Sequence, residues 1–317
     1  MRLKHLLAPA AALAMAGALG VPPSAGAAPA GPSTPTTPAT PTVPAAPDRP
    51  PIVIGATNLP EQAIVAYAYA DALEHAGYPV QVWADMGTRT TVESALAHGQ
   101  IGVEPDYAGS LLLLLDPKAT TAARWISRAV PAIRRILARS GATVLDPAPA
   151  LDANVFVVTR ATASRYHLRT VSDLRRQAPK LLLGGPPTCP TLPTCLQGLE
   201  RVYGLRFRGF EPLDEAGPAS VAALTTGKVQ VVELFSSDGT VIANGFVALV
   251  DDRHLQPVDR VIPVVRRSVA TPKVAAILDA LSARLTTARL SRLNLEVRGG
   301  QSPAAVALAW VQAQGLA

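Results

Sequence analysis

Histidines, acidic pairs and glycine-rich turns are the residues of this chain that could carry catalysis, and none of them forms a recognisable catalytic pattern. The five histidines are too far apart in the sequence for a metal cluster, and none has the spacing of a helical zinc motif. Asp251 and Asp252 are adjacent, so on a strand they would point to opposite faces, and a solvated turn is favoured. The turn at residues 184–187 lacks the lysine that follows a phosphate-binding loop. We therefore expect no catalysis, no metal and no cofactor.

The N-terminus has the pattern of an export signal. Arg2 and Lys4 precede an apolar, alanine-rich stretch at residues 6–21, and residues 25–27 offer the small side chains that signal peptidase requires. We predict a signal peptide at residues 1–27, with an uncleaved anchor helix as the alternative. Both cysteines lie far downstream, so no lipid-modified cysteine is expected at this site. The mature chain would be exported, to the periplasm or the cell surface.

Composition separates a linker from a globular part of the chain. Residues 28–51 consist almost entirely of Pro, Thr, Ala, Ser and Gly, and we predict a disordered linker there. The chain of 317 residues is 49% hydrophobic and 16% charged, which suffices for a large core. Beyond the signal, no uninterrupted apolar run approaches the roughly 20 residues that a bilayer requires, which excludes a multi-span membrane protein. The net charge of +6 is dispersed and only 4% of residues are aromatic, which argues against nucleic-acid binding.

The two cysteines stand six positions apart, at Cys189 and Cys195. Two close thiols in an exported protein most often form a disulfide. Metal binding is the competing interpretation, but no histidine or acidic residue lies in the same loop, so a zinc site would be half complete. We expect the disulfide, whose small ring would constrain the unfolded chain by about 2 kcal/mol.

Hydrophobic periodicity predicts two successive α/β series. The first has strands at residues 52–56, 80–84 and 101–104 and helices at 60–76, 90–98, 109–115 and 119–140. After a proline-rich break, the second has strands at 155–159, 181–184 and 229–235 and helices that begin near Ser172, Thr194 and Pro218. The chain returns through strands at 247–250 and 261–265 and ends in helices at 272–287, 290–295 and 303–314. This alternation predicts parallel sheets covered by helices on both faces.

The loops at the carboxyl ends of the predicted strands are where open α/β sheets bind ligands. They span residues 56–60, 85–90, 104–109, 185–194 and 236–244. We expect two lobes with a cleft between them, the first formed by residues 52–152 and 250–317 and the second by residues 153–249. Asn58 is expected to cap the helix that begins at Pro60, with Glu61 as its capping-box partner.

Seven segments, taken together and in order, resemble one known protein family. They are IGATNLPEQ (54–62), MGTR (86–89), GQIGVEPDYAGS (99–110), GGPPTCPTLPTC (184–195), YGL (203–205), LFSSDG (234–239) and LVDD (249–252). The chain resembles the substrate-binding proteins of ABC importers for glycine betaine, choline and related quaternary amines. The resemblance covers essentially all of residues 52–317.

The resemblance implies an α/β, two-lobed periplasmic-binding-protein fold of type II, with the ligand in the cleft between the lobes. Such proteins close on a small solute by hinge motion and deliver it to a membrane permease. A quaternary ammonium group cannot donate a hydrogen bond, so its recognition depends on aromatic faces. A betaine carboxylate requires a cation or backbone N–H groups. We expect a monomer whose partners are the solute and the permease.

The family's motifs also imply ligand-binding residues. Tyr107 matches the tyrosine of the family's Pro-Glu-Tyr-Thr-Gly stretch and is the first candidate ring, with a core tyrosine below the cleft as the alternative. The other candidates come from the turns and loops of the same motifs: Asn58, Gln62, Thr88, Thr90, Glu104, Thr188, Phe235, Ser237 and Asp238. Further rings for a cage are few, and they are Tyr67, Tyr69 and Phe246.

Four positions depart from the family's pattern. Gly102 stands where an aspartate is usual, and Glu104 stands where the family often has an aromatic residue. Leu192 and Thr57 replace an arginine and a lysine that would suit a carboxylate. The loss of two cations and the gain of an acid favour a purely cationic ligand such as choline, or an unrelated polar solute, over a zwitterionic betaine.

We therefore predict a non-enzymatic, exported solute-binding protein that delivers a quaternary amine to an ABC permease. One alternative is the same fold with a pocket changed to another small polar or cationic solute. Another is a secreted sensor or interaction module that is not coupled to transport, since a shared fold does not fix function.

Overall fold

A computed structural model of the chain describes residues 50–316. The predicted signal peptide at residues 1–27 lies outside the described residues, as does the predicted linker at 28–51 except for Pro50 and Pro51. Within residues 50–316, no helix is both long and apolar enough to cross a membrane.

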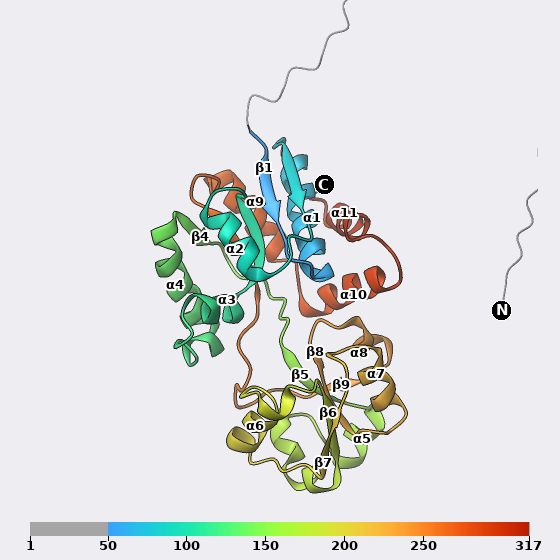
Figure 1. Cartoon of the computed structure of the whole chain (residues 1–317). Helices are drawn as coiled ribbons and strands as arrows, with labels where there is room; N and C mark the ends of the chain where they lie inside the picture. The colour runs from blue at the N-terminus through green and yellow to red at the C-terminus, as the bar shows by residue number, and fades with distance from the viewer. Residues whose placement is uncertain (1–49, 317) are drawn as a thin grey trace, which may run out of the picture. The chain divides into compact units, whose positions relative to one another are not determined.

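The first sheet has five strands in the order β2-β1-β3-β10-β4. Their bounds are Ile52–Gly55 (β1), Val80–Trp83 (β2), Val103–Tyr107 (β3), Ala142–Val144 (β4) and Val261–Arg266 (β10). β1 pairs in parallel with β2 and β3, whereas β10 runs antiparallel to β3 and β4. Figure 1 shows this sheet surrounded by helices from both ends of the described chain.

Helices cover both faces of the first sheet. They are α1 (Pro60–His75), α2 (Arg89–Ala97), α3 (Ala108–Leu115), α4 (Ile126–Leu137), α9 (Pro272–Ser282), α10 (Thr287–Arg298) and α11 (Pro303–Ala313). Alternate strand residues divide between two cores, as the period of two in a strand requires. Val261 and Val265 pack with α1, α9, α10 and α11, while Ile262 and Val264 pack with α2, α3 and α4.

The second sheet also has five strands, in the order β7-β6-β8-β5-β9. Their bounds are Asn154–Val158 (β5), Leu182–Gly185 (β6), Gly209–Pro212 (β7), Val231–Phe235 (β8) and Val247–Ala248 (β9). The α-helices are α5 (Arg160–Tyr166), α6 (Leu196–Gly198), α7 (Pro218–Thr225) and α8 (Gly239–Ala243), and a 3-10 turn spans Val171–Arg176. The apolar residues of the second sheet and its helices again form two clusters.

Both sheets are mixed, so the prediction of parallel sheets is wrong for the strands β5, β9 and β10. β5 runs antiparallel to β8 and β9, and β10 runs antiparallel to its two neighbours. β5 and β10 are the first strands after the chain passes from one sheet to the other (Figure 1). Neither follows a crossover helix within its own sheet, which is the connection that parallel neighbours need. The short strands β4 and β7 and the helices α5 and α8 were not predicted.

The predicted cap of α1 is also wrong. Leu59 occupies the N-cap position without a side-chain hydrogen bond, and Asn58 is exposed. Gln62 stabilises this turn instead, because its Oε1 accepts hydrogen bonds from the backbone N (3.1 Å) and the hydroxyl (2.6 Å) of Thr57. Glu61 is not available as a capping-box partner, since its carboxylate accepts hydrogen bonds from Tyr107 and Asn294.

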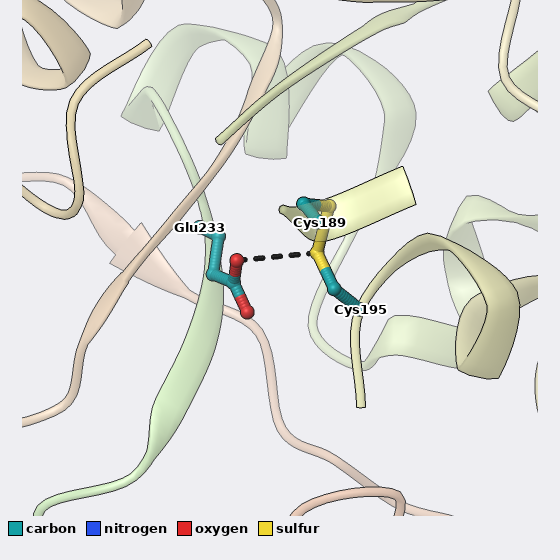
Figure 2. Close-up of side chains that lie close together, drawn as sticks. All are labelled: Cys189, Cys195 and Glu233. Atoms are coloured by element: carbon teal, nitrogen blue, oxygen red, sulfur yellow. Dashed lines mark hydrogen bonds between the residues drawn. A yellow bond between two sulfur atoms is a disulfide. The ribbon is translucent and has the colours of Figure 1, made fainter. Parts of the chain in front are cut away.

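The disulfide between Cys189 and Cys195 is confirmed, with the two Cα atoms 5.1 Å apart. Both cysteines are completely buried in the core of the second sheet. The carboxylate of Glu233, on β8, lies against the bond, with its Oε2 3.1 Å from the sulfur of Cys195 (Figure 2). A disulfide sulfur carries no proton, so this contact is a hydrogen bond when Glu233 is protonated. Burial, followed by the charge of Glu215, raises the pKa of Glu233 to about 7.

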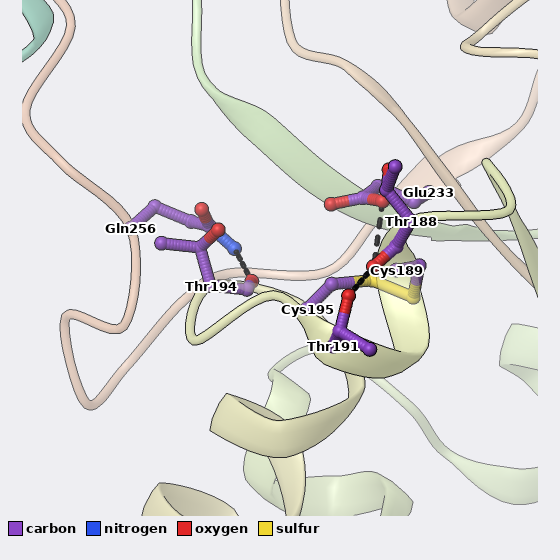
Figure 3. Close-up of a disulfide and its surroundings, with 7 residues drawn as sticks. All are labelled: Thr188, Cys189, Thr191, Thr194, Cys195, Glu233 and Gln256. Carbon is purple, nitrogen blue, oxygen red and sulfur yellow. Dashed lines mark hydrogen bonds between the residues drawn. A yellow bond between two sulfur atoms is a disulfide. The ribbon is translucent and has the colours of Figure 1, made fainter.

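The disulfide ring connects the second sheet to the segment that leads back to the first. Inside the ring, the Thr191 hydroxyl donates to the carbonyl of Thr188 over 2.9 Å. At its end, the carbonyl of Thr194 accepts a 2.7 Å hydrogen bond from Nε2 of Gln256 (Figure 3). The bond between the two sulfurs therefore restrains Thr194, which lines a cavity of about 730 Å³ together with Gln256.

We expect the replacement of Cys189 and Cys195 together by alanine to lower the free energy of unfolding by about 2 kcal/mol, because the unfolded chain loses a closed ring. Urea denaturation without reductant measures this difference. Thr191→Ala is the control, because it alters the ring and leaves the disulfide intact. A double variant as stable as the wild type would contradict the prediction.

Candidate functional site

A cavity of about 730 Å³ lies where the ends of the two sheets face each other. Its lining comes from the loop after β1 and the start of α1, the end of β3, the segment before β5, the loop after β8, the segment before β10, and α10, with further contributions from α2, α3 and the disulfide loop. The carboxyl ends of β1, β3 and β8 contribute, as expected for open α/β sheets. The segments that join the sheets contribute as well, although they follow no parallel strand.

A chain of hydrogen bonds crosses the cavity wall and centres on Glu61. The Tyr107 hydroxyl donates to Oε1 of Glu61 over 2.6 Å. The amide of Asn294, on α10, donates to Oε2 of Glu61 and, over 3.0 Å, to the carbonyl of Ser237. Burial raises the pKa of Glu61, and the hydrogen bonds from Tyr107, Ser237 and Asn294 oppose this shift. One carboxylate thereby joins β3, α1, α10 and the loop after β8.

Close approach of α10 to the loop after β8 depends on a glycine. A Cβ atom at Gly239 would lie 2.6 Å from the Cβ of Leu295 and 2.6 Å from the carbonyl of Ser291. The Ser291 hydroxyl donates to the carbonyl of Ser236 over 3.3 Å in the same contact. Any larger side chain at position 239 would push α10 away from the cavity wall.

Arg89 and Tyr107 form a second unit of the wall. Nε of Arg89 lies 2.9 Å from Oδ1 of Asp106, which also accepts a 2.7 Å hydrogen bond from the backbone N of Tyr107. The guanidinium carbon of Arg89 lies 5.9 Å from the centroid of the Tyr107 ring. Asp106 therefore fixes both residues, and the ring already has a cation within the range of a cation–π contact.

Two further carboxylates line the cavity from the segments that join the sheets. Oδ1 of Asp152 accepts a 2.5 Å hydrogen bond from the Ser237 hydroxyl. Asp259 accepts from the backbone N and the hydroxyl of Ser110, over 2.7 and 2.9 Å. Burial, followed by the charge of Glu61, raises the pKa of Asp152 to about 7, and burial also raises the pKa of Asp259.

The charges of the lining favour a cation. Four carboxylates line the cavity, from Glu61, Asp152, Asp238 and Asp259. Two guanidinium groups line it as well, and each is paired with a carboxylate, Arg89 with Asp106 and Arg298 with Asp238 over 3.3 Å. Apolar residues and the rings of Tyr107 and Phe235 form much of the rest. The cavity can hold a small positively charged group with apolar substituents.

Four of the predicted ligand-binding residues line this cavity: Tyr107, Phe235, Ser237 and Asp238. The other six are not among its lining residues: Asn58, Gln62, Thr88, Thr90, Glu104 and Thr188. The carboxamide oxygen of Gln62 is taken by Thr57, and the hydroxyl of Thr88 pairs with that of Thr91. A role in ligand binding stays a prediction for all ten residues.

Several lining residues that carry charge or hydrogen bonds were not predicted from the sequence: Glu61 in this role, Arg89, Asp152, Asp259 and Asn294. Two signals could have found some of them. Arg89 lies within the MGTR motif, and Asp152 stands three positions after the last proline of the proline-rich break, Pro149. Asn294 lies in a helix close to the end of the chain, and nothing in the local sequence places it beside Glu61.

Residues 50–313 match a family model described as the substrate binding domain of ABC-type glycine betaine transport system. The glycine betaine-binding protein YehZ of Escherichia coli (strain K12) is 24% identical over 258 residues, which cover 78% of this chain and 85% of that protein. The carnitine transport binding protein OpuCC of Listeria monocytogenes is 24% identical over 273 residues, 82% of this chain and 86% of that protein. A crystal structure of a glycine betaine/carnitine/choline ABC transporter protein superposes with a TM-score of 0.78 at 25% identity, covering 84% of this chain and 99% of that one.

We expect stability to fall as pH rises through the titration range of Asp152. Its pKa is about 7 in the folded protein and near 3.8 in the unfolded chain, so the folded state retains the proton between these values. One such group lowers the free energy of unfolding by about 1.4 kcal/mol per pH unit in that window. Asp152→Asn should make the decline between pH 5 and 7 shallower in urea denaturation. Glu296→Gln, at an exposed position of α10, is the control, and an identical pH profile for Asp152→Asn and the wild type would contradict the prediction.

Proposed function

The chain belongs to the family of substrate-binding domains of ABC-type glycine betaine transport systems, and from this premise we propose that its cavity binds a quaternary amine of the choline type. The expected two-lobed, type II periplasmic-binding-protein fold is confirmed. Proteins of this family are extracytoplasmic binding proteins that deliver a small ligand to an ABC permease. The ligand of this chain is inferred from the residues that line its cavity.

The acidic lining is the observation that carries the proposal. A quaternary ammonium is attracted to carboxylates without a hydrogen bond, and the ionised carboxylates of the cavity supply that attraction, with Asp152 joining them above its pKa of about 7. The rings of Tyr107 and Phe235 supply apolar and aromatic surface for its methyl groups. A betaine or carnitine carboxylate would have to share Arg89 or Arg298 with the carboxylate to which that arginine is already paired. A purely cationic ligand avoids this cost, so we favour choline over the zwitterions.

The remaining expectations about the protein belong to this proposal. We propose that residues 52–152 and 250–317 form the first lobe and residues 153–249 the second, so that the segments at their junctions act as the hinge. We also propose an exported monomer without catalytic activity, in the periplasm or at the cell surface. The hydrogen bonds of α10 with the loop after β8 join the two proposed lobes, which supports a closing motion of one lobe onto the other.

One alternative is a cavity that has changed to another small cationic or polar solute. It has a basis in the structure, because Oδ2 of Asp238 and Oε1 of Gln256 are buried without a hydrogen-bond partner in the described part of the chain. A ligand with N–H groups would satisfy them, whereas a quaternary amine would not. A sensor or interaction module without a permease is the second alternative, and it differs in its partner rather than in its cavity.

Calorimetry with choline, glycine betaine and carnitine tests the ligand class. We expect saturable binding of choline with one site and weaker binding of the two zwitterions. Choline at 100 times its dissociation constant should stabilise the protein by about 2.7 kcal/mol in a thermal-shift measurement. Primary amines and polyamines belong in the same screen. An absence of heat with all three quaternary amines would refute the proposal, and binding of a primary amine alone would favour a changed cavity.

We expect the aromatic ring of Tyr107 to contribute more to choline affinity than its hydroxyl group does. Tyr107→Leu removes the aromatic face, and we expect choline affinity to fall by about 2- to 30-fold, the range of cation–π contributions of about 0.5–2 kcal/mol. Tyr107→Phe retains the ring and loses the hydrogen bond to Glu61, so affinity should change less. Tyr166→Leu, on α5 and outside the cavity lining, is the control. Equal effects of the leucine and phenylalanine variants would show that the ring does not contact the ligand.

A further inference from the structure

Three carboxylates converge between α2 and β3, outside the lining of the solute cavity. Glu93 lies on α2, and Glu104 and Asp106 lie two positions apart on β3, so both of the latter point to the same face of the sheet. One oxygen from each carboxylate lies within 4.8 Å of the other two. We propose that this cluster is a binding site for a hard divalent cation.

The oxygens of the cluster lack the partners that a buried carboxylate requires. Glu104 and Asp106 are each only 2% exposed. Oε1 of Glu104, Oδ2 of Asp106 and Oε1 of Glu93 are buried without a hydrogen-bond partner among residues 50–316. Buried polar groups in native proteins are nearly always paired, and an unpaired buried charge is especially costly. Three such oxygens within one cluster of carboxylates therefore favour a positively charged group at this place.

Arg89 places a positive charge next to the cluster, but its guanidinium group is already paired. Arg89, one turn before Glu93 on α2, bonds to Oδ1 of Asp106 through its Nε, 2.9 Å away. That same Oδ1 also accepts the backbone N–H of Tyr107, which leaves Oδ2 as the orphan. One guanidinium group cannot neutralise three carboxylates.

The remaining surroundings are apolar. Val92 and Leu96 of α2 and Val264 of β10 belong to the same core as this face of the sheet. Val264 also stands opposite Glu104 in the antiparallel pair of β3 and β10. An apolar shell disfavours isolated charges and strengthens the attraction between the carboxylates and a bound ion.

The donor set selects the kind of ion. All three ligands are carboxylates, and the cluster includes no histidine or thiolate. Oxygen ligands of this kind suit Mg²⁺, Ca²⁺ or Mn²⁺, which take six or more oxygens at about 2.0–2.6 Å, with water completing the shell. A proton shared between Glu93 and Glu104 is the competing explanation, and it requires no ion.

A bound ion would also affect the solute cavity. Asp106 holds the backbone of Tyr107 and the guanidinium of Arg89, and both of these residues line the cavity. An ion that orients Asp106 would therefore fix the end of β3 and the wall that faces the solute. This coupling rests on the proposed function, whereas the ion site itself does not.

The test is metal binding by the full chain after treatment with a chelator. We expect titration calorimetry with CaCl₂, MgCl₂ and MnCl₂ to show saturable binding of one equivalent of at least one of these ions. The same ion should raise the unfolding temperature, and the chelator should reverse that rise. Glu104→Gln should weaken binding by tenfold or more. Because this variant alters a core residue, the half-buried Glu93→Gln serves as a second variant with the same expected effect.

Glu233→Gln is the matched control, because it removes a buried carboxylate from the second sheet and should leave ion binding unchanged. Absence of saturable binding for all three ions would overturn the proposal and favour the shared proton. Ion binding that persists unchanged in Glu104→Gln and Glu93→Gln would overturn it as well, since the ion would then lie elsewhere. Both readouts are independent of choline, so failure of the proposed solute leaves this test intact.

Discussion

Buried negative charge at the junction of the two sheets is the constraint on which the arrangement of this protein depends. Glu61 is the centre of it, because its two oxygens hold Tyr107 of β3 and Asn294 of α10, and Asn294 in turn holds the carbonyl of Ser237 after β8. A carboxylate that is almost fully buried is tolerated only where such hydrogen bonds replace water. The hydrogen bonds that satisfy Glu61 therefore hold three distant parts of the chain at one wall of the cavity.

The preference of the cavity for a cation over a zwitterion depends on which of its charged residues are already paired. Its arginines are not free cations, because Arg89 is paired with Asp106 and Arg298 with Asp238. Its carboxylates outnumber them and include Asp152 and Asp259, which accept hydrogen bonds from serines and not from lysine or arginine. A zwitterion and a cation of the same size therefore meet different costs in this cavity. Two relatives are named for the zwitterions glycine betaine and carnitine. The ligand of this chain is therefore inferred from its own acidic lining and not from those names.

In the second sheet, a disulfide supports the wall of the cavity. The disulfide between Cys189 and Cys195 is buried with Glu233 against it, and its ring ends at Thr194, which bonds to Gln256 in the segment leading to β10. The covalent bond thus acts next to a 3-10 turn, Cys189–Thr191, and the three-residue helix α6. It supports the cavity wall through the position of Thr194 without taking part in the chemistry of binding.

The sequence by itself determined the local elements, the disulfide and the family. Strands such as β1 and β8 and helices such as α1 and α11 follow from hydrophobic periodicity, which is a local property, and seven collinear motifs carried the resemblance. The antiparallel direction of β5 and β10 and the partners of Glu61 were decided only by the tertiary structure. Each of these depends on residues that are far apart in the chain, such as Glu61 and Asn294, and local sequence carries no information about which distant group will satisfy a buried charge. Tyr107, Phe235, Ser237 and Asp238 could be placed near the cavity because the motifs located their loops, whereas Asp152, Asp259 and Asn294 became lining residues only when the two sheets and α10 came together.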